Sequence, residues 1–175
     1  NGSLESRARR LFALSISIGL LAIISLVSVL ARFTNPPSLR VDLVLIAVAL
    51  GGAATSFFLF KWSGFPKVTK ASEVFSISVS FFGSFIGFGS IVYLSSGVVE
   101  TLDAGIWEAT AGITTTAMSG LDAESLSSSM HIFRSLTQWF GGMSALCLVF
   151  IATPISAKDD IASSGYASKI FSRSP

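Results

Sequence analysis

The chain has 175 residues, of which 51% are hydrophobic and 13% charged, and its formal net charge is +2. A soluble domain of this length needs a more polar surface, so the composition predicts an integral membrane protein. Basic residues stand at the ends of apolar runs rather than in one patch, which argues against nucleic-acid binding. A single cysteine and a single histidine exclude an internal disulfide and a multi-histidine metal site, and no motif indicates an enzyme.

Apolar runs long enough to span a bilayer occupy residues 11–33, 41–60, 74–94 and 132–154. The first run has 23 residues, which makes about 34 Å of helix and matches the hydrocarbon core. Residues 103–113 reach only about half that length, and a segment rich in Thr, Ser, Gly and Asp follows at 114–129. The chain is therefore predicted to be an all-α membrane protein with four transmembrane helices, one re-entrant pore helix and a filter loop.

Glycines inside the second and third apolar runs predict close helix packing rather than a ligand site. The second run contains Gly51 and Gly52, and the third contains Gly83, Gly87 and Gly89, of which the first two have the GxxxG spacing.

Charge is distributed unequally between the two sides of the predicted membrane. If four segments span, one side receives nine basic residues: Arg7, Arg9, Arg10, Lys61, Lys67, Lys70, Lys158, Lys169 and Arg173. The other side has Arg32 and Arg40, but its residues 95–130 contain no Lys or Arg and carry five acids: Glu100, Asp103, Glu108, Asp122 and Glu124. The positive-inside rule predicts a multi-pass cell-membrane protein with both termini in the cytosol. A negative outer mouth would raise the local concentration of cations.

Residues 114–116 form a threonine triplet directly after the short helix. The carboxyl end of that helix would point its partial negative charge at a dehydrated cation, and the carbonyls of Thr114, Thr115 and Thr116 would replace water around it. A β-branched side chain stiffens an extended backbone, and its hydroxyl can brace the loop. An ordinary external loop with three threonines remains the alternative interpretation.

Two strings flank the polar loop: residues 107–117 read WEATAGITTTA, and residues 133–144 read FRSLTQWFGGMS, with Pro154 beyond them. Over residues 72–154 the chain resembles the Trk/Ktr/HKT superfamily of potassium transporters, which consists of four repeats of two spanning helices around a pore helix. The resemblance implies an N-terminal two-helix segment at 1–70, one repeat at 71–155 and a cytosolic linker to a next repeat at 156–175. The chain would then be part of a longer polypeptide, with four assembled copies as the alternative.

The resemblance also implies the roles of individual residues. The backbone of Thr114, Thr115, Thr116 and Ala117 would bind K⁺, and Glu108, Arg134 and Gln138 would support this filter. Arg134 is expected to lie within about 4 Å of Glu108. Gln138 and Trp139 are expected to face the pore helix. Gly141 and Gly142 are expected to pack closely against a neighbouring helix, and Pro154 is expected to end the last helix.

Ala117 departs from the family pattern, which has glycine at this position. In the plant branch a serine here accompanies sodium transport, so a Na⁺ or weakly selective pathway stands beside K⁺ uptake. A non-conducting membrane scaffold is the further alternative. Expected partners are the remaining pore repeats, a second copy in a homodimer, a cytosolic nucleotide-binding regulatory subunit and the lipid bilayer.

Overall fold

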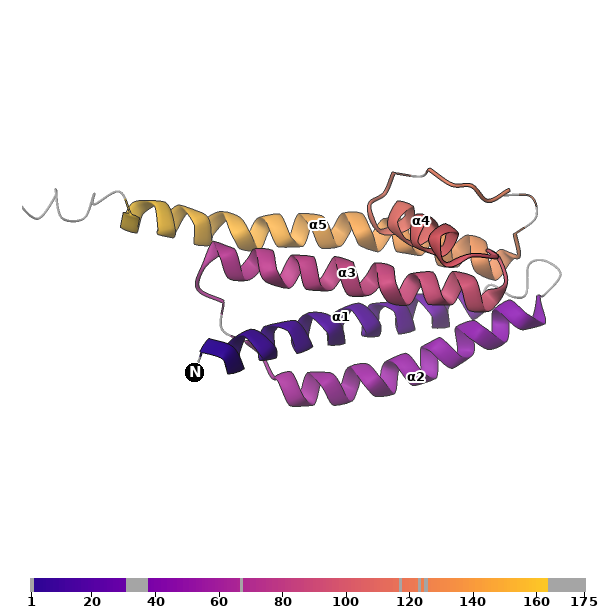
Figure 1. Cartoon of the computed structure of the whole chain (residues 1–175), viewed down its shortest axis with the longest axis horizontal. Coiled ribbons are helices and arrows are strands. Elements are labelled where there is room, and N and C mark those ends of the chain that lie inside the picture. The colour runs from indigo at the N-terminus through magenta and orange to yellow at the C-terminus, as the bar shows by residue number, and fades with distance from the viewer. Residues whose placement is uncertain are drawn as a thin grey trace, which may run out of the picture.

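The computed structural model describes residues 2–30, 38–66, 68–116, 118–122, 124 and 126–163, with side chains from residue 4 to residue 157 (Figure 1). This part of the chain is helical and contains no β-strand. Its five helices are α1 (Gly2–Leu30), α2 (Leu39–Ser63), α3 (Ala71–Ser96), α4 (Leu102–Ile113) and α5 (Ser128–Ser163).

Four of the described helices, α1, α2, α3 and α5, are long and apolar enough to cross a membrane. They run side by side, whereas α4 is short and lies beside one end of α3 and α5 (Figure 1). We call this end, where α3 finishes and α5 starts, the site end of the bundle. The predicted all-α fold and the four apolar spans are confirmed, and they indicate a multi-pass membrane protein.

Helix α1 occupies the middle of the bundle and packs closely on α2. A methyl group on Gly52 would lie 3.1 Å from the Cβ of Ala22, so glycine lets the two helices approach. Ser56 adds a hydrogen bond from its hydroxyl to the carbonyl oxygen of Ser15 at 2.7 Å. The packing role predicted for the second apolar run is therefore confirmed at Gly52, whereas Gly51 faces open space.

All four long helices extend beyond the apolar runs that predict them, and α1 and α5 extend furthest. Helix α1 starts at Gly2, because the residues before its apolar run, including Glu5 and Arg7, are good helix formers. Helix α5 continues through Pro154 to Ser163, so the prediction that this proline ends the helix is wrong. Proline removes one backbone hydrogen bond, but neighbouring groups can satisfy the freed carbonyl in a membrane helix.

Candidate functional site

Helix α4 lies against α3 through small residues on both helices. A methyl group on Gly105 would lie 2.9 Å from the carbonyl oxygen of Ser90, and one on Gly89 would lie 3.2 Å from the Cβ of Ala109. A methyl group on Gly83 or Gly87 would meet nothing within 4 Å among the described residues, so this GxxxG pair does not mark a close helix contact there. Gly89, rather than the GxxxG pair, provides the close contact of α3 with α4.

Helix α5 also packs on α4 through glycines. A methyl group on Gly112 would lie 2.8 Å from Thr137 Oγ1. Gly141 lies directly against the carbonyl group of Ile113, the last residue of α4, and a methyl group there would be 2.7 Å from the Ile113 carbonyl carbon. Helix α4 thus packs against the two long helices of the predicted repeat, and Gly141 stands at one of these close contacts.

The threonine triplet forms a tight turn at the end of α4. Thr114 has φ −87° and ψ 0°, and its hydroxyl donates to the carbonyl oxygen of Thr110 at 2.7 Å. Thr115 has φ +59°, the left-handed region, and its N–H donates to the carbonyl oxygen of Gly112 at 3.1 Å. The extended backbone predicted for the triplet is therefore wrong at Thr114 and Thr115, whereas the predicted bracing by a hydroxyl is present.

Thr115 is strained, because a β-branched side chain in the left-handed region clashes with its own backbone. Helices often end with a left-handed residue, but that residue is usually glycine. Strain of this kind persists where the surroundings fix the backbone, and it is concentrated at functional sites. Thr115 also lies near α5, since a methyl group on Gly142 would be 3.5 Å from its Cγ2. All three threonines are exposed, and Ala117 lies outside the described residues.

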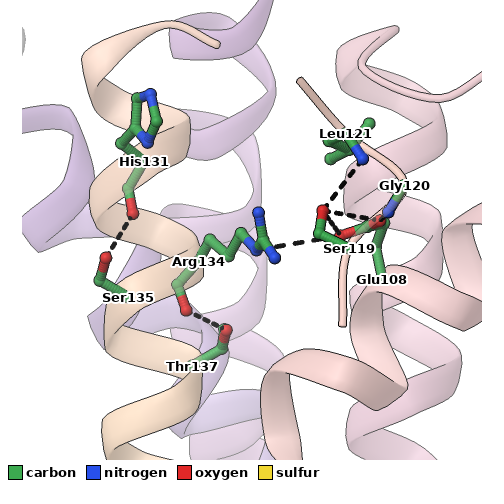
Figure 2. Close-up of polar contacts among 8 residues, drawn as sticks. All are labelled: Glu108, Ser119, Gly120, Leu121, His131, Arg134, Ser135 and Thr137. Carbon is green, nitrogen blue, oxygen red and sulfur yellow. Dashed lines mark hydrogen bonds and ion pairs between the residues drawn. The ribbon is translucent and has the colours of Figure 1, made fainter. Parts of the chain in front are cut away.

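Glu108 is the polar centre of the site (Figure 2). Its carboxylate is buried on α4 and accepts hydrogen bonds from the Ser119 hydroxyl at 2.9 Å and the Gly120 N–H at 2.7 Å. The Ser119 oxygen in turn accepts the N–H of Leu121 at 3.0 Å. Arg134 reaches across from α5 and places its Nε 3.9 Å from Glu108 Oε2. One carboxylate therefore joins α4, the chain that returns from the threonine turn, and α5.

The Glu108–Arg134 contact lies where the sequence predicts it. Ser119 and Gly120 were missed, because a serine eleven residues after a glutamate forms no recognisable pattern. Trp139 is 68% exposed, so the prediction that it faces the pore helix is wrong, and Thr137 occupies that position. Gln138 is half-buried, and its supporting role stays a prediction.

A cavity of about 570 Å³ opens beside Glu108 at the site end. Its lining includes Glu100, Asp103 and Trp107, which places two further acids around the same opening. A hydrogen bond from the Thr101 side chain holds the pKa of Asp103 below its usual range, so this exposed carboxylate stays ionised. The cavity therefore carries negative charge close to the buried carboxylate.

Comparison with known protein families, curated proteins and solved structures finds no match for this chain. Function therefore has to be inferred from the residues and contacts described above.

Proposed function

We propose that this chain contributes one quarter of the selectivity filter of a potassium-uptake pore in the cell membrane. The supporting observation is the position of the threonine turn: it follows a helix of 12 residues, about 18 Å long, that packs against two long apolar helices. The chain leaves α3 and rejoins α5 at the same end of the bundle (Figure 1). In the proposed pore, α4 is a re-entrant helix and the turn is a filter loop, and this path supports that arrangement.

The chemistry of the turn suits a dehydrated cation. The carboxyl end of α4 carries partial negative charge, and non-helical backbone at membrane depth is tolerated where it lines water. The carbonyls of Thr114, Thr115, Thr116 and Ala117 replace the ion's water, and Glu108 fixes the returning loop through Ser119 and Gly120. Selection then depends on fixed carbonyl positions rather than on a charged ligand.

One such loop is a quarter of a pore, so further repeats have to complete it. Exposed apolar side chains on α4 and α5, among them Ile106 at 44% and Met143 at 47%, offer a surface for these repeats. We place them in the same polypeptide or in other copies, with both termini in the cytosol. A homodimer and a cytosolic nucleotide-binding regulator complete the proposed assembly.

The test is ion flux into proteoliposomes that contain the purified protein with the chains that co-purify with it. Uptake of K⁺ or Rb⁺ above that of empty liposomes is expected, together with discrimination against Na⁺. Absence of flux for every cation tested would overturn the pore and favour a membrane scaffold.

Ala117 favours a second candidate, a sodium or weakly selective pathway, because a Cβ at the filter glycine position restricts the backbone. Flux in wild type and in Ala117→Gly separates the two. A higher K⁺-to-Na⁺ ratio in the variant supports the second candidate, and an unchanged ratio rejects it.

A further inference from the structure

The first turn of α2 contacts both ends of the segment that carries the site. Arg40 Nε donates a hydrogen bond to the carbonyl oxygen of Ser95 at 3.1 Å, one residue before α3 ends. Asp42 Oδ1 accepts a hydrogen bond from the hydroxyl of Ser129 at 2.7 Å, in the first turn of α5. Two residues on one turn therefore bind the two long helices where residues 97–127 leave and rejoin the bundle.

Both contacts are chemically well matched to their places. The last carbonyls of a helix have no partner within the helix and carry partial negative charge, so a guanidinium at Ser95 is favourable. The guanidinium also lies over Gly97, where a methyl group would be 2.8 Å from Arg40 Cζ. Asp42 is 1% exposed and stands in the first turn of α2, where the helix dipole favours a carboxylate. Ser129 is 3% exposed, so this hydrogen bond is shielded from water.

We propose that Arg40 and Asp42 are positioning residues for the candidate filter. They clamp the site ends of α3 and α5 at a fixed separation, where Tyr93 and Phe133 also bring these helices into contact, and α4 packs against both helices. Because Gly105 and Gly141 leave no slack against their neighbours, a change in that separation moves α4 and the threonine turn with it. The N-terminal helix pair thereby has a role in the site. Its effect on ion selectivity rests on the proposed function, whereas the clamp itself does not.

Amide hydrogen exchange of the full chain in lipid nanodiscs tests the clamp. Arg40→Ala and Asp42→Ala are each expected to speed exchange in residues 112–122 about tenfold, because each removes a charge-assisted hydrogen bond. Asp42→Asn keeps an oxygen that accepts the hydrogen bond from Ser129, so its amides in residues 112–122 are expected to exchange as slowly as those of the wild type. Arg9→Ala is the matched control: it removes the contact between Arg9 Nη1 and Glu73 Oε1 at 3.1 Å, which also joins the N-terminal pair to α3 but at the opposite end.

Faster exchange confined to the site end in Arg40→Ala and Asp42→Ala, with Arg9→Ala unchanged there, supports the clamp. Unchanged exchange at 112–122, or an equal rise in every helix, overturns it. If Asp42→Ala does not fold, Ser129→Ala removes the same hydrogen bond with a smaller change and is judged by the same criterion.

Flux provides the second readout, in the same proteoliposomes as above. If the wild type conducts, Arg40→Ala is expected to lower the ratio of K⁺ flux to Na⁺ flux, and Arg9→Ala is expected to leave this ratio unchanged. An unchanged flux ratio in Arg40→Ala overturns the link between the clamp and selectivity. If the wild type carries no ion, the proposed function fails while the exchange result still decides the clamp.

Discussion

Gly141 and Gly142 are neighbours on α5, and the structure predicts opposite results when each is changed to alanine. A methyl group on Gly141 would lie 2.7 Å from the Ile113 carbonyl carbon. Carbon atoms approach favourably to about 3.5 Å, and the Ile113 carbonyl oxygen would be closer still to the methyl group, so α4 and α5 must separate locally by at least about 0.8 Å. Forcing a close-packed contact apart in this way costs about 1–3 kcal/mol. Gly141→Ala is therefore expected to destabilise the protein.

Gly142→Ala is the matched control, because its methyl group would lie 3.5 Å from Thr115 Cγ2, an ordinary contact. Both variants gain up to about 1 kcal/mol from replacing glycine in a helix. The free energies of unfolding of the two variants should thus differ by about 2 kcal/mol. Equilibrium unfolding in mixed micelles, followed by circular dichroism, measures this difference. Equal stability of the two variants would refute the close approach of Gly141 to the end of α4.

Three further predictions concern the polar groups of the site. Glu108→Ala leaves the charge of Arg134 and the loop donors without their acceptor, and should lower the free energy of unfolding by about 3 kcal/mol. Ser119→Ala should lower it by only about 1 kcal/mol. Equal losses of stability in thermal unfolding would contradict the central role of the carboxylate. Thr115→Gly should stabilise the fold by roughly 1 kcal/mol by removing left-handed strain, and should lower the K⁺-to-Na⁺ flux ratio; a destabilised variant would show that Thr115 is not strained. Because the pKa of Asp103 is lowered, this side chain is negatively charged at any pH above the usual carboxyl pKa. The charge is lost only when the pH falls through the lowered pKa. Asp103→Asn should therefore reduce cation uptake at neutral pH in low salt and have little effect in high salt, and an equal reduction in both would rule out an electrostatic role.

The apolar runs predict the helices well, because a bilayer span requires about twenty apolar residues and few other segments meet that condition. The ends of the helices are harder to predict. Residues 2–10 and 155–163 are polar but compatible with a helix, so hydropathy alone does not include them. Pro154 shows the same limit, since a proline signals a helix end only where the freed carbonyl has no other partner.

Within the site, the sequence predicts the pairing of oppositely charged residues. A buried acid and a base in neighbouring apolar segments are costly apart, and Glu108 and Arg134 do meet. The hydrogen bonds of Ser119 and Gly120 depend on how the loop returns, which no local pattern determines. The left-handed backbone of Thr115 could not be predicted either, because β-branched residues rarely adopt it.

The packing of α4 explains how a strained turn can persist. The helix meets both α3 and α5 at glycines, so backbone and short side chains are in contact and no long side chain can yield. Glu108 then ties the returning loop to α4. These constraints act together on the few residues around Thr115, and their combined energy can offset the roughly 1–2 kcal/mol of left-handed strain. A selectivity filter requires a backbone whose oxygens keep their positions when an ion replaces water. In the proposed filter, tight glycine packing, the buried carboxylate of Glu108 and the proposed clamp at Arg40 and Asp42 would each reduce a different movement of that backbone. Loosening any one of them should then alter ion preference before it abolishes folding.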